Sequence, residues 1–210
     1  MMKKPVKYIL GTLAILVVLY FSFDIRKLDV YKSENIGLAF DAVLYANDVW
    51  KNKLPEVAVQ APELTYLFDL LESAPESAFT EFGKKLGISK TWYFFAKGEG
   101  EIDSAGDETI WVKISDDRQI QLATAFIFGN AVREGSGVVN IDDFINMTDF
   151  NNVSVALNKK VKDEIIPVLI KNSGTGRRLK FSGVFEINEE KIDLNAIRII
   201  PVSINFEHAE

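Results

Sequence analysis

The pair Arg133-Glu134 is the first candidate for a functional site, because it joins a cation and an acid in a segment that follows a predicted strand. An arginine presents a planar fork of N–H donors, which can hold a carboxylate, a phosphate or neighbouring hydroxyls of a sugar. The same pair can instead form a structural ion pair that anchors the loop before a helix. The sequence leaves both roles open.

Two asparagines form the second candidate. Asn146 and Asn158 lie on one predicted helix, where their separation along the chain turns them roughly 120° apart around the axis. Amide side chains can recognise sugar hydroxyls, and they can equally satisfy backbone carbonyls of nearby loops when they are buried. Both interpretations stay open at this point.

Residue types that most catalytic and metal sites need are scarce. The chain contains no cysteine, and its one histidine is His208 near the C-terminus. Zinc sites and histidine-based triads therefore lack their usual residues. Acidic doublets such as Asp116-Asp117 and Asp142-Asp143 fall in predicted turns or at a helix start, and no spacing sets two carboxylates across a cleft. We expect no catalytic residues, no metal and no cofactor.

The charge of the chain argues against one class of partner. The formal net charge is −6, and the first 29 residues carry more cations than acids, so the remainder is more acidic than the total. An acidic surface repels a phosphate backbone. We expect no binding to nucleic acid.

The N-terminal region predicts a membrane anchor. Residues 8–23 are uncharged and mostly apolar, no small-residue cleavage site follows them, and three lysines precede them. Their length lies between that of a signal-peptide core and that of a spanning helix. We expect residues 1–29 to form a cytoplasmic N-terminus, an uncleaved single-pass anchor and a short linker. The positive-inside rule then puts residues 30–210 outside the bacterial inner membrane, in the periplasm.

Residues 30–90 predict a small helical lobe. A first helix covers residues 35–50 and stops at Leu54-Pro55, and its apolar stripe is Ile36, Phe40, Val43, Leu44 and Trp50. Pro62 opens a second helix, with the stripe Leu64, Leu67, Phe68 and Leu71. Ser73 to Glu76 reads as a capping box that begins a third helix.

Residues 91–210 predict a barrel. The apolar period of two gives strands at residues 94–102, 110–114 and 120–128, and later at 179–187 and 197–206. Between these groups, Asp142 or Asp143 caps a helix to about Asn158, and Pro167 kinks or breaks its continuation. A slip of the apolar phase at Pro201 predicts a bulge or an edge position.

Three strands, a helix and two strands follow the order of an OB-type barrel. We therefore predict an α+β fold, which consists of an N-terminal transmembrane helix, a small helical lobe and an OB-like five-stranded barrel with a covering helix.

Short motifs in register over about residues 38–206 carry a family resemblance. They are Phe40-Asp41 with Tyr45 and Trp50, Phe82-Gly83, Gly129-Asn130-Ala131-Val132-Arg133-Glu134, Phe144 and Asn146, Leu157-Asn158, Phe181-Ser182-Gly183-Val184-Phe185 and Pro201-Val202. With them the chain resembles an uncharacterised bacterial family of predicted periplasmic lipoproteins, often found beside genes for sugar ABC transporters. It departs from that family in lacking the lipid-attachment cysteine, so the anchor is expected to be the helix itself.

The resemblance implies a location and a setting but no established activity. Our preferred hypothesis is a non-catalytic, membrane-anchored periplasmic accessory module, whose partner is an envelope protein such as a sugar transporter component. The competing hypothesis is a small-ligand binding domain for a sugar or an anionic metabolite, with Arg133, Glu134, Asn146 and Asn158 as the candidate residues.

Overall fold

The computed structural model describes residues 40–195 and 197–207. The chain divides into two units, Met1–Phe40 and Asp41–Glu210, and the fold below is that of the second unit. The predicted anchor, residues 8–23, and His208 lie outside the described residues. In the described part of the chain, no helix is long and apolar enough to cross a membrane.

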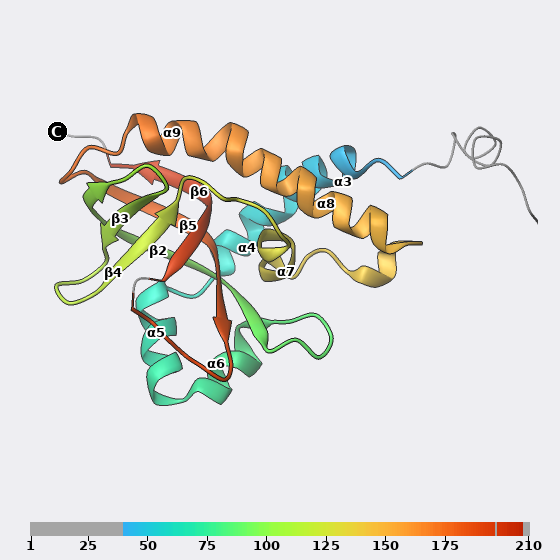
Figure 1. Cartoon of the computed structure of the whole chain (residues 1–210), viewed down its shortest axis with the longest axis horizontal. Helices are drawn as coiled ribbons and strands as arrows, with labels where there is room; N and C mark the ends of the chain where they lie inside the picture. Colours follow the sequence, from blue (N-terminus) through green and yellow to red (C-terminus); the bar gives the residue numbers. More distant parts are fainter. Residues whose placement is uncertain (1–39, 196, 208–210) are drawn as a thin grey trace, which may run out of the picture. The chain divides into compact units, whose positions relative to one another are not determined.

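Five strands close into a barrel (Figure 1). They are β2 (Thr91–Ala105), β3 (Thr109–Lys113), β4 (Gln119–Ala123), β5 (Arg178–Asn188) and β6 (Arg198–Phe206). Neighbours run in the order β2-β3-β4-β6-β5, and β5 pairs again with β2. A short strand, β1 (Gly83–Lys84), pairs with β2 outside this ring.

The topology confirms the predicted OB-like barrel. Consecutive strands β2, β3 and β4 pair antiparallel as a meander, whereas β4 and β6 pair parallel. The helices between β4 and β5 are the connection that makes this parallel pairing possible. The bulge predicted at Pro201 is also confirmed, since Ser182 pairs with Ser203 and the adjacent Gly183 pairs with Pro201, which leaves Val202 as the extra residue.

The first helical segment differs from its prediction at Pro55. Helix α3 (Ala42–Asp48) continues through a π-helical turn, η2 (Val49–Lys53), into α4 (Leu54–Gln60), so Pro55 does not stop it. Proline lacks an N–H and its ring collides with the carbonyl four residues earlier in an α-helix. The wider turn, in which Leu54 N–H bonds Val49 O, relieves this conflict. The predicted apolar stripe is wrong as well, because Val43 and Leu44 are exposed.

The next two helices lie against one end of the barrel. Helix α5 (Leu64–Ser73) buries the predicted stripe Leu64, Leu67, Phe68 and Leu71, although it begins after Pro62 rather than at it. Helix α6 (Pro75–Glu81) follows, but the predicted capping box is wrong. Ser73 belongs to α5 and donates its hydroxyl to Asp69 O, so it is not an N-cap.

The connection between β4 and β5 holds the elements that build the site. Helix α7 (Ala131–Ser136) and a 3₁₀ turn, η3 (Ile141–Asp143), precede α8 (Met147–Lys160). A second π-helical turn, η4 (Val161–Ile165), leads into α9 (Ile166–Lys171) and accommodates Pro167 as η2 accommodates Pro55. The rod from α8 to α9 lies along the barrel beside α3 (Figure 1).

Two predictions for this connection are wrong. Asn146, and not Asp142 or Asp143, caps α8: its backbone is extended and its Oδ1 accepts from Asp149 N–H at 2.9 Å. The third predicted strand also ends early, at Ala123, because the chain turns out of the sheet there. Phe126 and Phe128 therefore lie in an exposed loop instead of on the barrel face.

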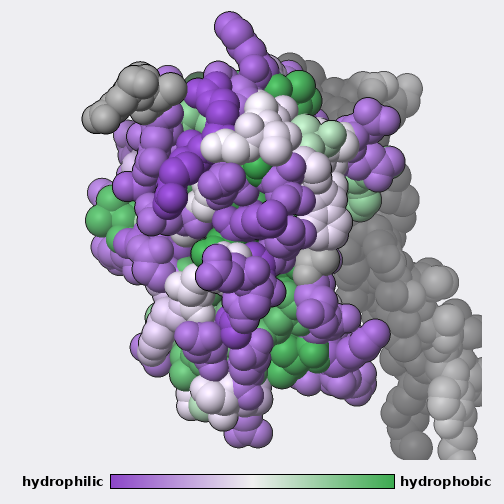
Figure 2. Space-filling view, turned by 90° about the vertical axis from the view of Figure 1, so that its left-hand side faces the viewer, coloured by the Kyte–Doolittle hydropathy of each residue, from purple (hydrophilic) through white to green (hydrophobic). Residues whose placement is uncertain are grey.

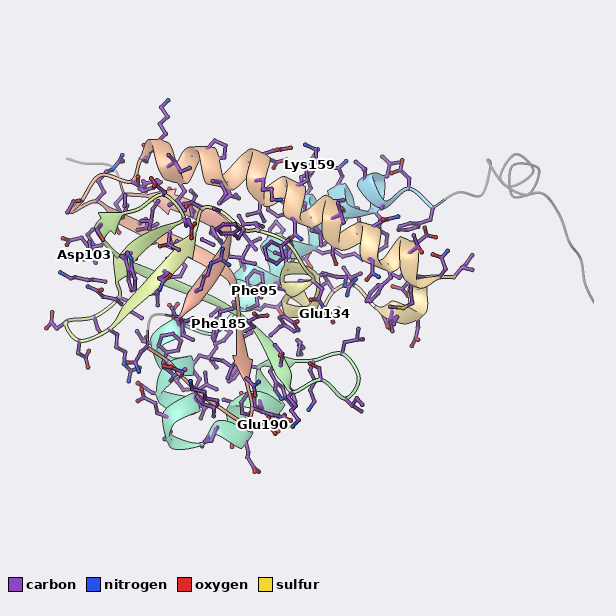
Figure 3. All side chains as sticks on the ribbon, viewed as in Figure 1. Phe95, Asp103, Glu134, Lys159, Phe185 and Glu190 are labelled. Atoms are coloured by element: carbon purple, nitrogen blue, oxygen red, sulfur yellow. The ribbon has the colours of Figure 1, made fainter. Side chains whose placement is uncertain are left out.

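An aromatic cluster forms the centre of the core. Phe94 and Phe185 are fully buried and stack with their centroids 5.4 Å apart, and Phe68 of α5 meets Phe185 edge to face. Phe185 lies in the interior, whereas Lys159 projects from the exposed side of α8 (Figure 3). On the face shown in Figure 2, hydrophilic residues dominate and apolar ones form scattered patches. The barrel thus gives α8 and α9 a rigid support.

Candidate functional site

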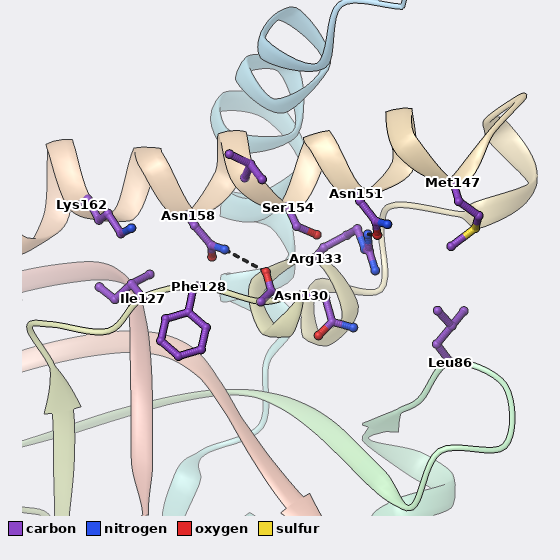
Figure 4. Close-up of a pocket in the computed structure, with 12 residues that line it drawn as sticks. Leu86, Ile127, Phe128, Asn130, Arg133, Met147, Asn151, Ser154, Asn158 and Lys162 are labelled. Carbon is purple, nitrogen blue, oxygen red and sulfur yellow. Dashed lines mark hydrogen bonds between the residues drawn. The ribbon is translucent and has the colours of Figure 1, made fainter.

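A pocket of about 480 Å³ lies between α8 and the loop that leaves β4 (Figure 4). One wall belongs to the helix rod and carries the polar side chains Asn151, Ser154, Asn158 and Lys162, beside the apolar Met147 and Val155. The facing wall is apolar, with Leu86, Ile127 and Phe128. A volume of this size and a mixture of apolar walls with a few polar groups are typical of small-molecule sites.

The polar wall follows from helical periodicity. Residues 151, 154, 158 and 162 are spaced by three, four and four positions, so they share one face of the rod. Figure 4 shows these side chains pointing from the helix to the same side, toward Phe128 and Arg133. A neighbouring face of the rod, with Val153, Leu157 and Val161, is buried.

Asn158 is held in one orientation. Its Nδ2 donates to Gly129 O at 2.8 Å, a bond that ties α8 to the loop. The amide oxygen, Oδ1, therefore points away from that loop carbonyl, and it is buried without a hydrogen-bond partner among the described residues. The side chain is only 5% exposed. An amide oxygen of this kind can accept a hydrogen bond from a donor that enters the pocket.

Ser154 lies one helical turn before Asn158 and also has a buried polar atom without a hydrogen-bond partner in the described residues. Its side chain is 6% exposed, and its Oγ forms no hydrogen bond within the described part of the chain. Serine hydroxyls in helices commonly bond the carbonyl four residues earlier, but Ser154 does not. The pocket thus contains two unmatched polar atoms on adjacent turns of α8.

Arg133 forms the floor of the pocket and fastens α7 to α8. It is 2% exposed, and its guanidinium carbon lies 3.5 Å from the centroid of the Phe150 ring. Nε and Nη2 donate to Glu134 Oε1 at 2.9 and 2.5 Å, while Nη1 donates to Phe150 O and Asn151 Oδ1. Most of its donors are therefore engaged within the protein.

Asn130 contributes another oriented amide. Its Oδ1 accepts from the Tyr93 hydroxyl at 3.1 Å. Burial, followed by the nearby carboxylates of Glu186 and Glu134, raises the pKa of Tyr93 above its usual value of 10.0. Tyr93 therefore remains a hydroxyl donor at neutral pH. Because Asn130 Oδ1 accepts this bond, the Nδ2 of the same amide points away from the Tyr93 hydroxyl.

The loop that carries the apolar wall has an uncommon backbone. Phe126 has a φ of 50° and Gly129 a φ of 80°, so two left-handed residues bracket Ile127 and Phe128. A left-handed conformation costs free energy at a non-glycine residue. Between these two left-handed residues, Ile127 is buried in the core, while Phe128 stays 69% exposed beside the pocket.

The structure brings together two of the four residues that the sequence singled out. Arg133 and Asn158 line the pocket. Glu134 lies beside it and pairs with Arg133. Asn146 is an exposed cap, whose Nδ2 donates to Asp149 Oδ2 at 2.8 Å, and it does not line the pocket.

Sequence reasoning missed Asn151, Ser154, Lys162 and Phe128. The signal for the first three was their helical spacing from Asn158, whereas Phe128 had no signal because it appeared to belong to a strand. In the described part of the chain, no group of three or more His, Asp or Glu side chains is placed to hold a metal ion. The chemistry that these residues offer is recognition of hydroxyls, amides and anions.

Comparisons with known proteins agree with the barrel. A crystal structure of an OB-fold protein from Thermotoga maritima MSB8 is similar with a TM-score of 0.71 and 29% sequence identity, over 80% of this chain and 99% of that one. A search of curated proteins finds no match. The family model described as predicted periplasmic lipoprotein (DUF2291) matches residues 13–205. That description supports a periplasmic, envelope-associated location. The chain therefore belongs to this family of predicted periplasmic lipoproteins.

Proposed function

We propose that this protein is a non-catalytic binding module of the bacterial envelope that holds a small hydroxylated molecule in the pocket under α8. The observation that carries the proposal is the pair of buried, unmatched polar atoms, Ser154 Oγ and Asn158 Oδ1. A ligand hydroxyl can donate to the amide oxygen of Asn158 and exchange a hydrogen bond with the hydroxyl of Ser154.

The energetic reason is the cost of leaving such atoms unmatched. Native proteins satisfy the large majority of their buried polar side-chain atoms. Each one left without a partner costs about 1 to 3 kcal/mol. The two atoms lie on adjacent helical turns in residues that line one cavity, and a ligand that reaches them removes this cost.

This proposal takes the second of the two hypotheses that the sequence raised. The first, an accessory module that contacts an envelope protein such as a sugar transporter component, stays a prediction, and it is compatible with ligand binding. Anchoring by residues 8–23 also remains a proposal, supported by their apolar composition and by the absence of cysteine for lipid attachment. With that anchor, the binding domain works at the periplasmic face of the inner membrane.

Capture of small molecules tests the proposal directly. The full-length protein, purified in detergent and immobilised, is incubated with a small-molecule extract of bacterial cells, washed and eluted for mass spectrometry. The pocket variant is Val155→Trp, because Val155 lines the pocket yet is 67% exposed, so a larger side chain fills the mouth without disturbing the core. The matched control is Val168→Trp on α9, which is 46% exposed and lies outside this pocket.

We expect the wild type and Val168→Trp to enrich the same hydroxylated compound and Val155→Trp to lose it. Equal enrichment by all three proteins, or no enrichment by the wild type, would overturn the proposal. Circular dichroism spectra of the two variants check that each is folded.

A further inference from the structure

We infer that the pocket selects a sugar-sized molecule that carries an anionic group, with that group bound at Lys162. The inference rests on the proposed function and goes further, because it names the charge of the ligand and the end of the pocket that binds the charged group. It starts from the distribution of charge around the cavity.

The pocket is electropositive in an acidic protein. The chain has 30 Asp and Glu residues against 24 Lys and Arg residues. Among the described residues that line the pocket, however, the only charged ones are Arg133 and Lys162, and both are cations. An anionic molecule is repelled by most of the surface and attracted to this cavity, which is a basis for selectivity.

Of these two cations, only Lys162 is available to a ligand. The charge of Arg133 is balanced by Glu134 at 2.5 Å, and its remaining contacts hold Phe150 and Asn151. Lys162 forms no ion pair with any described residue, although neighbouring Lys159 and Lys160 on the same rod pair with Asp163 and Glu164. A single exposed ammonium group is therefore directed to the pocket by its position on the polar face of the rod.

The rest of the pocket matches a hydroxylated ring. Phe128 is 69% exposed and lies near the Lys162 end, where its face can stack against the C–H face of a sugar (Figure 4). Along the helix, Ser154 Oγ and Asn158 Oδ1 have no partner among the described residues, so ring hydroxyls can bond with them. The volume of about 480 Å³ is within the usual range for small ligands. A ring between Phe128 and α8 puts its acidic substituent next to Lys162.

The test compares three probes of similar size, D-glucose, D-glucuronate and D-glucose 6-phosphate. Their dissociation constants are measured by isothermal titration calorimetry with the full-length protein at low salt. The informative variant is Lys162→Gln, which keeps a polar, slightly shorter side chain but removes its charge. The matched control is Lys159→Gln, which removes a charge from the outer side of the same helix.

We expect at least one acidic probe to bind about tenfold or more tightly than glucose, since a hydrogen bond to a charged group is worth more than 1.4 kcal/mol. In Lys162→Gln this preference falls to about twofold or less, while Lys159→Gln behaves as wild type. The comparison of D-glucuronate with D-glucose 6-phosphate shows whether the pocket prefers a carboxylate or a phosphate. Higher salt weakens binding of the acidic probe and leaves glucose unchanged.

Three results overturn the inference. They are equal affinity for glucose and both acidic probes, a preference that survives Lys162→Gln, and no binding of any probe. Each is distinguishable from failure of the proposed function. Capture of another molecule by the wild type but not by Val155→Trp would leave the pocket as a binding site and reject only the anionic class.

Discussion

Replacing Ser154 by alanine is predicted to stabilise the unliganded protein. The Ser154 hydroxyl is buried in α8 without a partner, so its removal eliminates a desolvation cost of about 1 to 3 kcal/mol, part of which is offset by lost packing. Alanine also favours the helix over serine by about 0.5 kcal/mol. We expect the free energy of unfolding to rise by about 1 to 2 kcal/mol. Ligand binding should weaken in the same variant, because Ser154 lines the pocket and its hydroxyl is one of the two proposed ligand contacts.

A second buried serine provides the matched control. Ser182 in β5 is 3% exposed, and its hydroxyl bonds the Ser203 hydroxyl at 3.1 Å. Ser182→Ala removes a satisfied hydrogen bond, so it should lower the free energy of unfolding by about 1 kcal/mol. The two substitutions remove the same atom at similar burial and differ in the presence of a partner and in the element, since Ser182 lies in a strand and gains no helix propensity.

Urea unfolding of the full-length protein, followed by tryptophan fluorescence, measures both changes. A stabilisation of 1 kcal/mol corresponds to roughly 2 to 4 °C in melting temperature for a domain of this size, so calorimetry gives an independent check. Ser154→Ala that destabilises the protein as Ser182→Ala does would refute the reasoning, because the hydroxyl would then have a partner in the unliganded state. A gain of no more than about 0.5 kcal/mol would reduce the effect to helix propensity.

Three further predictions concern contacts of α7 and of the helix rod. Arg133→Met should lower the free energy of unfolding by about 3 to 5 kcal/mol in urea titrations, because it leaves unpaired the carboxylate of Glu134, whose side chain is only 11% exposed. Asn146→Ala should cost about 1 kcal/mol through loss of the α8 cap, without a change in ligand affinity. Hydrogen bonds from Lys160 and then from Trp50 lower the pKa of Glu164 below its usual 4.5, so its contribution is present at neutral pH and is lost as the pH falls through the lowered pKa. Wild-type stability should fall more steeply with acid than that of Glu164→Gln.

Each of these three has a contradicting result. A change below about 1 kcal/mol in Arg133→Met would mean that Arg133 neither compensates Glu134 nor holds α7 against α8. Weaker ligand binding in Asn146→Ala, at unchanged stability, would return that residue to the binding site. Parallel pH profiles for the wild type and Glu164→Gln would show that this carboxylate has the same pKa in the folded and unfolded states.

The barrel was predictable because its strands repeat a local pattern. Alternation identified the strands around Phe94, Ile110 and Phe181, and the phase slip at Pro201 located the bulge that the structure contains. The order of the elements then limited the topology to an OB-like closure. These features depend on neighbours along the chain, so a single sequence carries them.

The helices were harder because their ends depend on tertiary packing. Pro55 and Pro167 were interpreted as stops or breaks, but each follows a π-helical turn that lets the rod continue. Helix α7 was missed because glycines interrupt its pattern. Gly135 is needed there, since a Cβ on it would lie 2.4 Å from Val184 Cγ1 and prevent the close approach of α7 to β5.

The candidate site was predictable in part. Residue type alone identified Arg133 and Asn158, which line one pocket. Ser154 escaped notice because serine is common in helices, and its importance comes from a missing hydrogen bond that only coordinates reveal. Phe128 was assigned to a strand, and only the early end of β4 turns it toward α8. Sequence thus indicates the chemistry of the site, whereas the fold determines which residues meet.

A crystal structure of the full-length protein saturated with D-glucuronate tests the central claim most directly. The account predicts the ligand between Phe128 and α8, with hydroxyls within hydrogen-bond distance of Ser154 Oγ and Asn158 Oδ1 and its carboxylate at Lys162. A pocket that holds only ordered water at these two atoms, with the ligand absent or bound elsewhere, would contradict it.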